Sequence, residues 1–142
     1  MQRKRLVIMA PPVFGPDGQQ PMRGAWIDQI QVSRCGSDAL RSLLISVKDS
    51  SMQLAALLPG STDATPVLQR DALPAAEIQA KQAAKCQTKM VVIDTVIEGE
   101  LKPGAPWNEV WTFHGCDNAT AKVAMAFVPD GKGGTNYVAS RK

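Results

Sequence analysis

The chain has 142 residues, of which 44% are hydrophobic and 20% charged, a composition typical of a folded globular protein and not of a disordered or fibrous one. The formal net charge is +3, but five of the sixteen Lys and Arg residues lie within the first five and last two positions. Residues 6–140 carry eleven basic and thirteen acidic residues, a formal charge of −2, which argues against a sequence-specific nucleic-acid-binding domain.

The N-terminus begins with positive residues, followed by a short apolar run over residues 6–10. This run is shorter than the roughly 7–15 apolar residues of a secretory signal, so it predicts a short strand or extended segment. Residues 11–24 hold four of the ten prolines, and proline removes a backbone donor, so we expect an irregular segment there. The sequence thus predicts a basic, proline-rich arm or loop over residues 1–24, including one short strand, and a single α+β domain over residues 25–142.

The next segments mix strand and helix patterns. Residues 25–35 predict a short strand. Leucines and valine recur at helical spacing in residues 37–47, which predicts a helix capped by Ser or Asp at its start. A strand stays open as an alternative there, because Ile45 and Val47 are β-branched. Residues 59–66, PGSTDATP, predict a connecting loop.

The clearest helix pattern begins near Asp71, which we expect to cap it, with Pro74 in the first turn. The alanines of residues 76–83 line one side of this helix, where small side chains allow close packing against a sheet. Glu77 and Lys81 are spaced to form an ion pair on another side.

From residue 89 the apolar period changes from helical to two, which is typical of strands. Alternating or β-rich segments separated by turns occupy residues 89–97, 109–116, 121–127 and 135–140. The predicted fold class is therefore α+β: an antiparallel β-meander of three to five strands with two or three helices packed on one face.

The chain contains three cysteines, Cys35, Cys86 and Cys116, and one histidine, His114. No two cysteines form a CxxC pair, and the set lacks the spacing of a zinc site, so the sequence predicts no metal site and no cofactor. The odd cysteine count leaves two states open: one disulfide with one thiol, or three reduced thiols.

Two motifs in the C-terminal third carry a resemblance. Residues 109–116 read EVWTFHGC and residues 127–135 read FVPDGKGGT. They resemble the E-x-W-x-V-x-x-C-G and F-x-P-D-G-x-G-G-T motifs of small, uncharacterised envelope proteins of Gram-negative bacteria, although Asp117 stands where glycine is expected. The resemblance implies residence in the periplasm or attachment to the outer membrane, with the export signal absent from this sequence, and a cytoplasmic location is the alternative. It implies no catalytic residue.

An oxidising compartment in turn favours a disulfide. We expect Cys86, at the end of the predicted helix, to pair with Cys116, at the end of the strand that this helix would cross. Pairing of Cys35 with either of them is the alternative.

Two groups of residues suggest chemistry, and for both a structural role is the stronger prediction. The glycines of residues 131–134 are reminiscent of a phosphate loop, but a strand follows them instead of a helix, which predicts a hairpin turn. His114 and Cys116 suggest a nucleophile pair, but two residues along a strand separate them by about 7 Å, too far for direct proton transfer.

Paired carboxylates for acid–base chemistry are a further candidate. Asp94 and Glu98 share one face of a strand, but the strand rise separates them by about 13 Å, beyond the span of paired glycosidase carboxylates. Together with Glu100 they predict a solvated surface.

The remaining candidate is a loop with Lys102, Trp107 and Asn108. A loop tryptophan beside prolines can anchor a binding partner, although covering the edge of a sheet is its commoner role. We therefore expect a non-enzymatic bacterial envelope protein with a structural or protein-interaction role. The alternative is a small thiol-dependent hydrolase or similar enzyme using Cys116 and His114. The expected partner is an envelope protein or an anionic surface near the basic tails, with no sequence-specific nucleic acid. No transmembrane segment is predicted, because no apolar run approaches about 18 residues.

Overall fold

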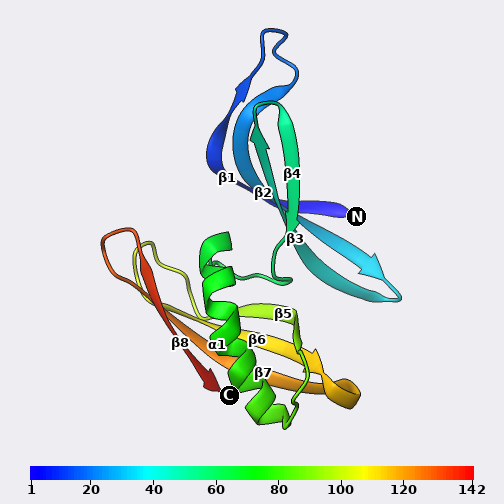
Figure 1. Ribbon diagram of the computed structural model, residues 1–142, viewed down its shortest axis with the longest axis vertical. Helices are drawn as coiled ribbons and strands as arrows, with labels where there is room; N and C mark the ends of the chain where they lie inside the picture. Colours follow the sequence, from blue (N-terminus) through cyan, green and yellow to red (C-terminus); the bar gives the residue numbers. More distant parts are fainter. The chain divides into compact units, whose positions relative to one another are not determined.

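The computed structural model describes residues 1–142, apart from the side chain of Arg34. Within this described chain, the elements follow in the order β1 (Gln2–Phe14), β2 (Pro21–Arg34), β3 (Ser37–Lys48), β4 (Ser51–Ala56), α1 (Pro66–Ala84), β5 (Val91–Glu98), β6 (Trp107–Gly115), the 3₁₀ turn η1 (Cys116–Asn118), β7 (Ala119–Pro129) and β8 (Thr135–Arg141) (Figure 1). The strands form two antiparallel four-stranded sheets, β1-β2-β3-β4 and β5-β6-β7-β8.

The predicted fold class is wrong. The chain is mostly β, with two sheets and, among the described residues, a single α-helix, whereas we expected one meander covered by two or three helices. The chain divides into two compact units, Met1–Leu57 and Leu58–Lys142, and each contains one sheet. The boundary expected after residue 24 lies within β2.

Residues 37–47, for which we expected a helix, form strand β3. Two-residue turns hold this strand between its neighbours, because Arg34 pairs with Ser37 and Lys48 pairs with Ser51. All four turn residues have positive φ, 51° and 77° at Cys35 and Gly36 and 48° and 62° at Asp49 and Ser50. Such turns match the twist of antiparallel strands, so the hairpin geometry overrides the helical spacing of the leucines.

The N-terminal arm is also more regular than expected. Residues 2–14 form β1, and its two prolines, Pro11 and Pro12, lie in an edge strand where a missing donor costs no ladder bond. The pairing of β1 with β2 shifts register at four points, which is typical of β-bulges. The remaining loop is short: Asp17 Oδ1 accepts the N–H of Gln19 at 3.0 Å, and β2 begins at Pro21.

The predicted helix is confirmed, but it begins five residues before Asp71. Thr65 caps it by accepting the Leu68 N–H at 3.3 Å, and Pro66 occupies the first turn. Pro74 consequently lies inside the helix, on its exposed side. The buried side presents alanines spaced by four residues, which lie against β7 and β8: Ala72, Ala76 and Ala80.

The strand pattern from residue 89 onward is confirmed as the meander β5-β6-β7-β8. Its inward side chains form the core of the second unit together with α1, and the largest of them are fully buried: Trp111, Phe113, Val123, Met125 and Phe127. Burying one such side chain contributes about 1.5–3 kcal/mol, so this unit has an ordinary hydrophobic core.

The described side chains of the first unit form no comparable core. Among the described side chains of residues 1–57, only Ser42 and Val47 are buried. A globular domain of this size normally buries about 60% of the surface of its unfolded chain. The β1–β4 sheet therefore leaves apolar surface exposed, and this surface is the first feature to consider as a functional site.

Candidate functional site

One face of the β1–β4 sheet carries an apolar row that crosses all four strands. Ile8 pairs with Trp26, Trp26 with Ile45, and Ile45 with Leu54. Directly paired residues share a face of the sheet, so these four side chains lie next to one another. Ile8 and Leu54, on the two edge strands, are 49% and 64% exposed.

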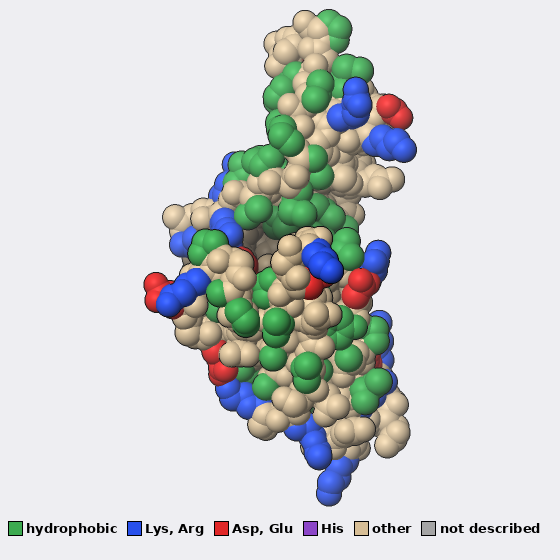
Figure 2. Space-filling model, turned by 90° about the vertical axis from the view of Figure 1, so that its left-hand side faces the viewer, with side chains coloured by type: hydrophobic (Ala, Val, Ile, Leu, Met, Phe, Trp, Pro, Cys, Tyr) green, Lys and Arg blue, Asp and Glu red, His purple; other side chains and the backbone are tan. Residues whose placement is uncertain are grey.

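A second row on the same face begins with Leu6 and includes Leu43, and between them lies Asp28. Arg3 neutralises this acid through two contacts, Nε–Oδ1 at 2.8 Å and Nη2–Oδ2 at 2.7 Å. The hydrogen bond to Asp28 and its charge raise the pKa of Arg3. We call Leu6, Ile8, Trp26, Leu43, Ile45 and Leu54 the apolar face; Figure 2 shows exposed hydrophobic side chains of this unit.

The opposite face of the same sheet is more polar. An open pocket of about 370 Å³ is lined there by Lys4, Gln29, Gln31, Asp38, Ala39 and Leu40. The acid in this pocket, Asp38, accepts hydrogen bonds from Ser33 and Gln31, and these bonds lower its pKa. The carboxylate is engaged within the sheet, so the pocket offers no pair of reactive groups.

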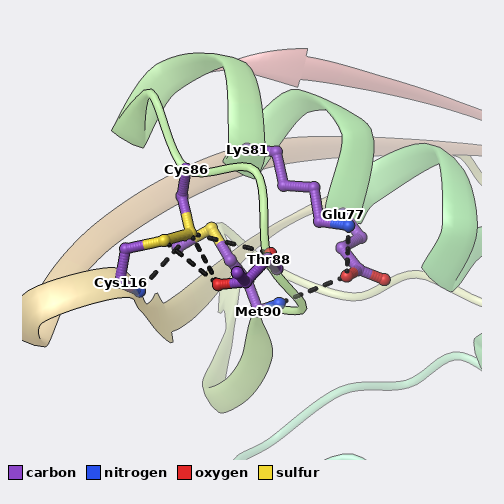
Figure 3. Close-up of a disulfide and its surroundings, with 6 residues drawn as sticks. All are labelled: Glu77, Lys81, Cys86, Thr88, Met90 and Cys116. Carbon is purple, nitrogen blue, oxygen red and sulfur yellow. Dashed lines mark hydrogen bonds and ion pairs between the residues drawn. A yellow bond between two sulfur atoms is a disulfide. The ribbon is translucent and has the colours of Figure 1, made fainter.

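In the second unit, the predicted disulfide between Cys86 and Cys116 is confirmed (Figure 3). Cys86 directly follows the helix cap and donates its N–H to the Lys81 carbonyl at 2.9 Å, whereas Cys116 begins η1 after β6. The Thr88 hydroxyl lies 3.1 Å from the sulfur of Cys116, and the Cys116 N–H donates to the sulfur of Cys86 at 3.4 Å. The third cysteine, Cys35, is an exposed free thiol.

Glu77 holds residues 87–90, which follow Cys86, against the helix (Figure 3). Its Oε1 accepts the Met90 N–H at 3.2 Å and lies 3.1 Å from Lys81 Nζ, the ion pair expected from the sequence. Burial raises the pKa of Glu77, but the hydrogen bonds from Lys81 and Met90 outweigh it, and the pKa lies below its usual 4.5.

This lowered pKa predicts acid sensitivity. Because the folded pKa of Glu77 lies below the unfolded one, its contribution to stability is complete above pH 4.5 and is lost as the pH falls through the folded value. Urea unfolding at a series of pH values should show a steeper acid loss in the wild type than in Glu77→Gln, and Lys81→Met should weaken this loss. Parallel pH profiles for wild type and Glu77→Gln would contradict the assignment.

Glu109 is fully buried and accepts four hydrogen bonds. Its Oε1 accepts from the Asp63 N–H and from Trp107 Nε1, both at 2.9 Å. Its Oε2 accepts from the Thr62 hydroxyl and from Trp111 Nε1, both at 2.7 Å. A buried carboxylate is tolerated only when its oxygens are fully hydrogen-bonded, so Glu109 joins the 58–65 loop to β6.

The same loop is held to β5 through Thr95. Its hydroxyl donates to the Pro59 carbonyl at 2.6 Å and accepts the Thr62 N–H at 3.0 Å. Gly60 lies directly against this strand with a φ of +94°, and a Cβ there would meet the Thr95 carbonyl oxygen at 2.3 Å. Only glycine fits at this position.

Gly60→Ala should therefore destabilise the second unit by about 2 kcal/mol more than Gly99→Ala. Gly99 is the matched control, because it also has a positive φ, +78°, but a Cβ there meets nothing within 4 Å. Denaturant unfolding of both variants measures the difference. Equal losses would mean that the loop shifts freely away from Thr95.

The predicted binding loop is largely built into the second unit. Trp107 begins β6, is half-buried, and stacks on Phe127 with the ring centroids 4.9 Å apart. Lys102 and Asn108 are exposed. One face of the indole and its N–H, which donates to Glu109 Oε1, are therefore partnered within the unit.

The structure gives the other sequence candidates structural positions in the second unit. The disulfide leaves Cys116 without a thiol, and His114 lies in β6 opposite Thr120. The glycines of residues 131–134 form the β7–β8 turn, as predicted, where Asp130 accepts the Lys132 and Gly134 N–H groups.

Asp94 and Glu98 both lie on β5, opposite Thr112 and Asn108. Glu98 forms an ion pair with Lys142. Among the described side chains, no three His, Cys, Asp or Glu residues are grouped to hold a metal ion. No helix of the described chain is long and apolar enough to cross a membrane.

Sequence reasoning missed the apolar face and the buried role of Glu109. The first was hidden because residues 37–47 were assigned to a helix, which separates Leu43 and Ile45 from Trp26. The alternation of apolar residues in 6–8, 26–32 and 43–47 was the available signal.

Comparison of the chain with protein-family models, with curated proteins and with solved structures returns no match.

Proposed function

We propose that this chain is a non-enzymatic bacterial envelope protein with a structural or protein-interaction role, acting through its β1–β4 sheet. The observation that carries the proposal is the apolar face, which leaves Ile8 and Leu54 about half exposed or more in a unit where only two of the described side chains are buried. Exposed apolar patches of this kind mark interaction surfaces in folded proteins. The second unit, with its own core and disulfide, would serve as the stable part that presents the sheet.

The envelope location is supported by the disulfide, since disulfides persist in oxidising compartments. The resemblance of residues 109–116 and 127–135 to envelope proteins points the same way. The alternative, a thiol-dependent enzyme using Cys116 and His114, has less support because Cys116 is bonded to Cys86. Its reactive thiolate would form only after reduction.

The interaction role is tested in cells with a photo-crosslinking residue at position 54 and, in a matched chain, at position 53. Leu54 lies on the apolar face, whereas Gln53 is its exposed neighbour on the opposite face of β4. Protein adducts at position 54 and few at position 53 are expected. Absence of adducts at both positions would contradict a protein-interaction role.

The location is tested by fractionating the native host and labelling thiols before reduction. One labelled cysteine per chain, Cys35, in the envelope fraction is expected. Three labelled cysteines in the cytosolic fraction would contradict the envelope assignment.

A further inference from the structure

The apolar face is large enough for a stable protein interface. Four strands about 4.8 Å apart span roughly 19 Å, and the rows from residue 39 to 47 of β3 extend about 30 Å. Allowing for the short β4, the flat area is roughly 500 Å², which the relief of side chains increases toward the ~800 Å² per partner of a standard interface. A surface of this size is costly to leave in water.

The charges of the sheet favour a partner without strong charge. On the apolar face itself, Arg3 and Asp28 neutralise each other within the same chain, and Arg41 is an exposed cation that the register of β2 and β3 places on this face. The cations Arg5 and Lys48 belong to the opposite face, since they share it with Gln29 and Ser51. An anionic lipid surface lying on the apolar face would gain little from these two cations. Arg41 is a single cation, whereas binding to anionic lipid takes a cluster of basic residues, and this favours an apolar protein surface as the partner.

We infer, on the basis of the interaction role proposed above, that the partner is a second copy of this chain, with the two apolar faces packed against each other as a β-sandwich. Symmetric dimers use the same patch on both subunits, and their interfaces are more apolar than those of transient complexes. Two sheets of equal twist pack face to face about 10 Å apart with strands inclined by about 30°. The row of Ile8, Trp26, Ile45 and Leu54 provides an unbroken apolar strip for this packing.

The test is sedimentation equilibrium of the full chain. The wild type should have twice the 15.2 kDa mass of one chain at micromolar concentration. Leu54→Glu should raise the dissociation constant at least about tenfold, because it places a charge in the interface without a partner. Gln53→Glu adds the same charge one residue away on the opposite face and should leave the dissociation constant unchanged.

A second variant tests whether Leu54→Glu weakens the dimer only by disturbing β4 locally. Ile8→Glu, on the other edge strand, should weaken the dimer as Leu54→Glu does, while circular dichroism stays that of the wild type.

A wild type that is monomeric at about 100 µM would overturn the inference, since obligate apolar interfaces are fully formed at that concentration. Equal weakening by Leu54→Glu and Gln53→Glu would also overturn it. If the purified chain is monomeric but position 54 forms adducts with a different protein in cells, the inference fails and the proposed interaction role stands. A purified chain that is monomeric, together with no adduct at position 54 in cells, would contradict both the dimer inference and the proposed interaction role.

Discussion

Replacing Glu109 with glutamine is expected to lower the free energy of unfolding of the second unit by about 3–5 kcal/mol. All four groups that contact this buried carboxylate donate a hydrogen bond to it. Two of them are tryptophan N–H groups, which cannot accept a hydrogen bond in return. A glutamine amide must turn its NH₂ toward one of the two oxygen positions. At either position at least one donor, Trp111 or Trp107, then faces another donor in a dry site.

The measurement is guanidinium unfolding followed by tryptophan fluorescence in a Trp26→Phe background, which leaves only Trp107 and Trp111 as probes. Glu100→Gln is the control, because it makes the same chemical change at an exposed loop position and should stay within about 0.5 kcal/mol of the parent. If Glu109→Gln is as stable as this control, the four hydrogen bonds do not hold the loop.

Removing the disulfide by Cys86→Ala with Cys116→Ala is expected to cost about 3–4 kcal/mol in the chain-entropy description. The bond links residues 30 positions apart and thus restricts the unfolded chain between them. It joins the end of α1 to the end of β6, so its loss should lower the unfolding midpoint of the second unit. Dithiothreitol added to the wild type should reproduce the effect of the double variant.

Cys35→Ala is the control for this experiment. Cys35 is exposed, forms no disulfide and lies in the β2–β3 turn of the other unit. Its replacement should leave the unfolding of the second unit unchanged, with or without reductant. A reductant effect that depends on Cys35 would mean that the disulfide exchanges partners.

Much of the second unit was predictable from local sequence. The alternation of inward residues along β7 predicted the strand and its buried face, and Val123, Met125 and Phe127 lie in the core as expected. The helix was found from its alanines, but its start was misplaced. Thr65 and Pro66 are also a good start signal, and Pro74 lies inside the helix on its exposed side.

The first unit was misjudged because local signals conflicted. Leucines at residues 40, 43 and 44 fit a helix as well as a strand, and only pairing with β2 and β4 decides between them. The deciding turns contain Cys35 and Asp49 at positive φ, positions where glycine or asparagine would have been a clearer signal. Prolines at positions 11 and 12 led us to expect an irregular segment, but they lie in β1, an edge strand, where proline is tolerated.

Among the candidate sites, too, one was predicted from the sequence and one was not. The disulfide was expected from compartment and element order, whereas Glu109 gave no sign of burial, since a glutamate in a strand usually faces water. Its environment is created by residues 62 and 63, more than forty positions away in the chain.

By itself, the sequence determined the near-neutral body between basic ends, the helix, the C-terminal meander and, through its motifs, the cysteine pair. These depend on period, turn residues and charge counts, which are local properties. The tertiary structure alone decided that residues 37–47 are a strand, that the chain forms two units and that Glu109 is buried. It also showed that one sheet exposes an apolar face. Each of these depends on contacts between residues distant in sequence, whose free energy outweighs local preference.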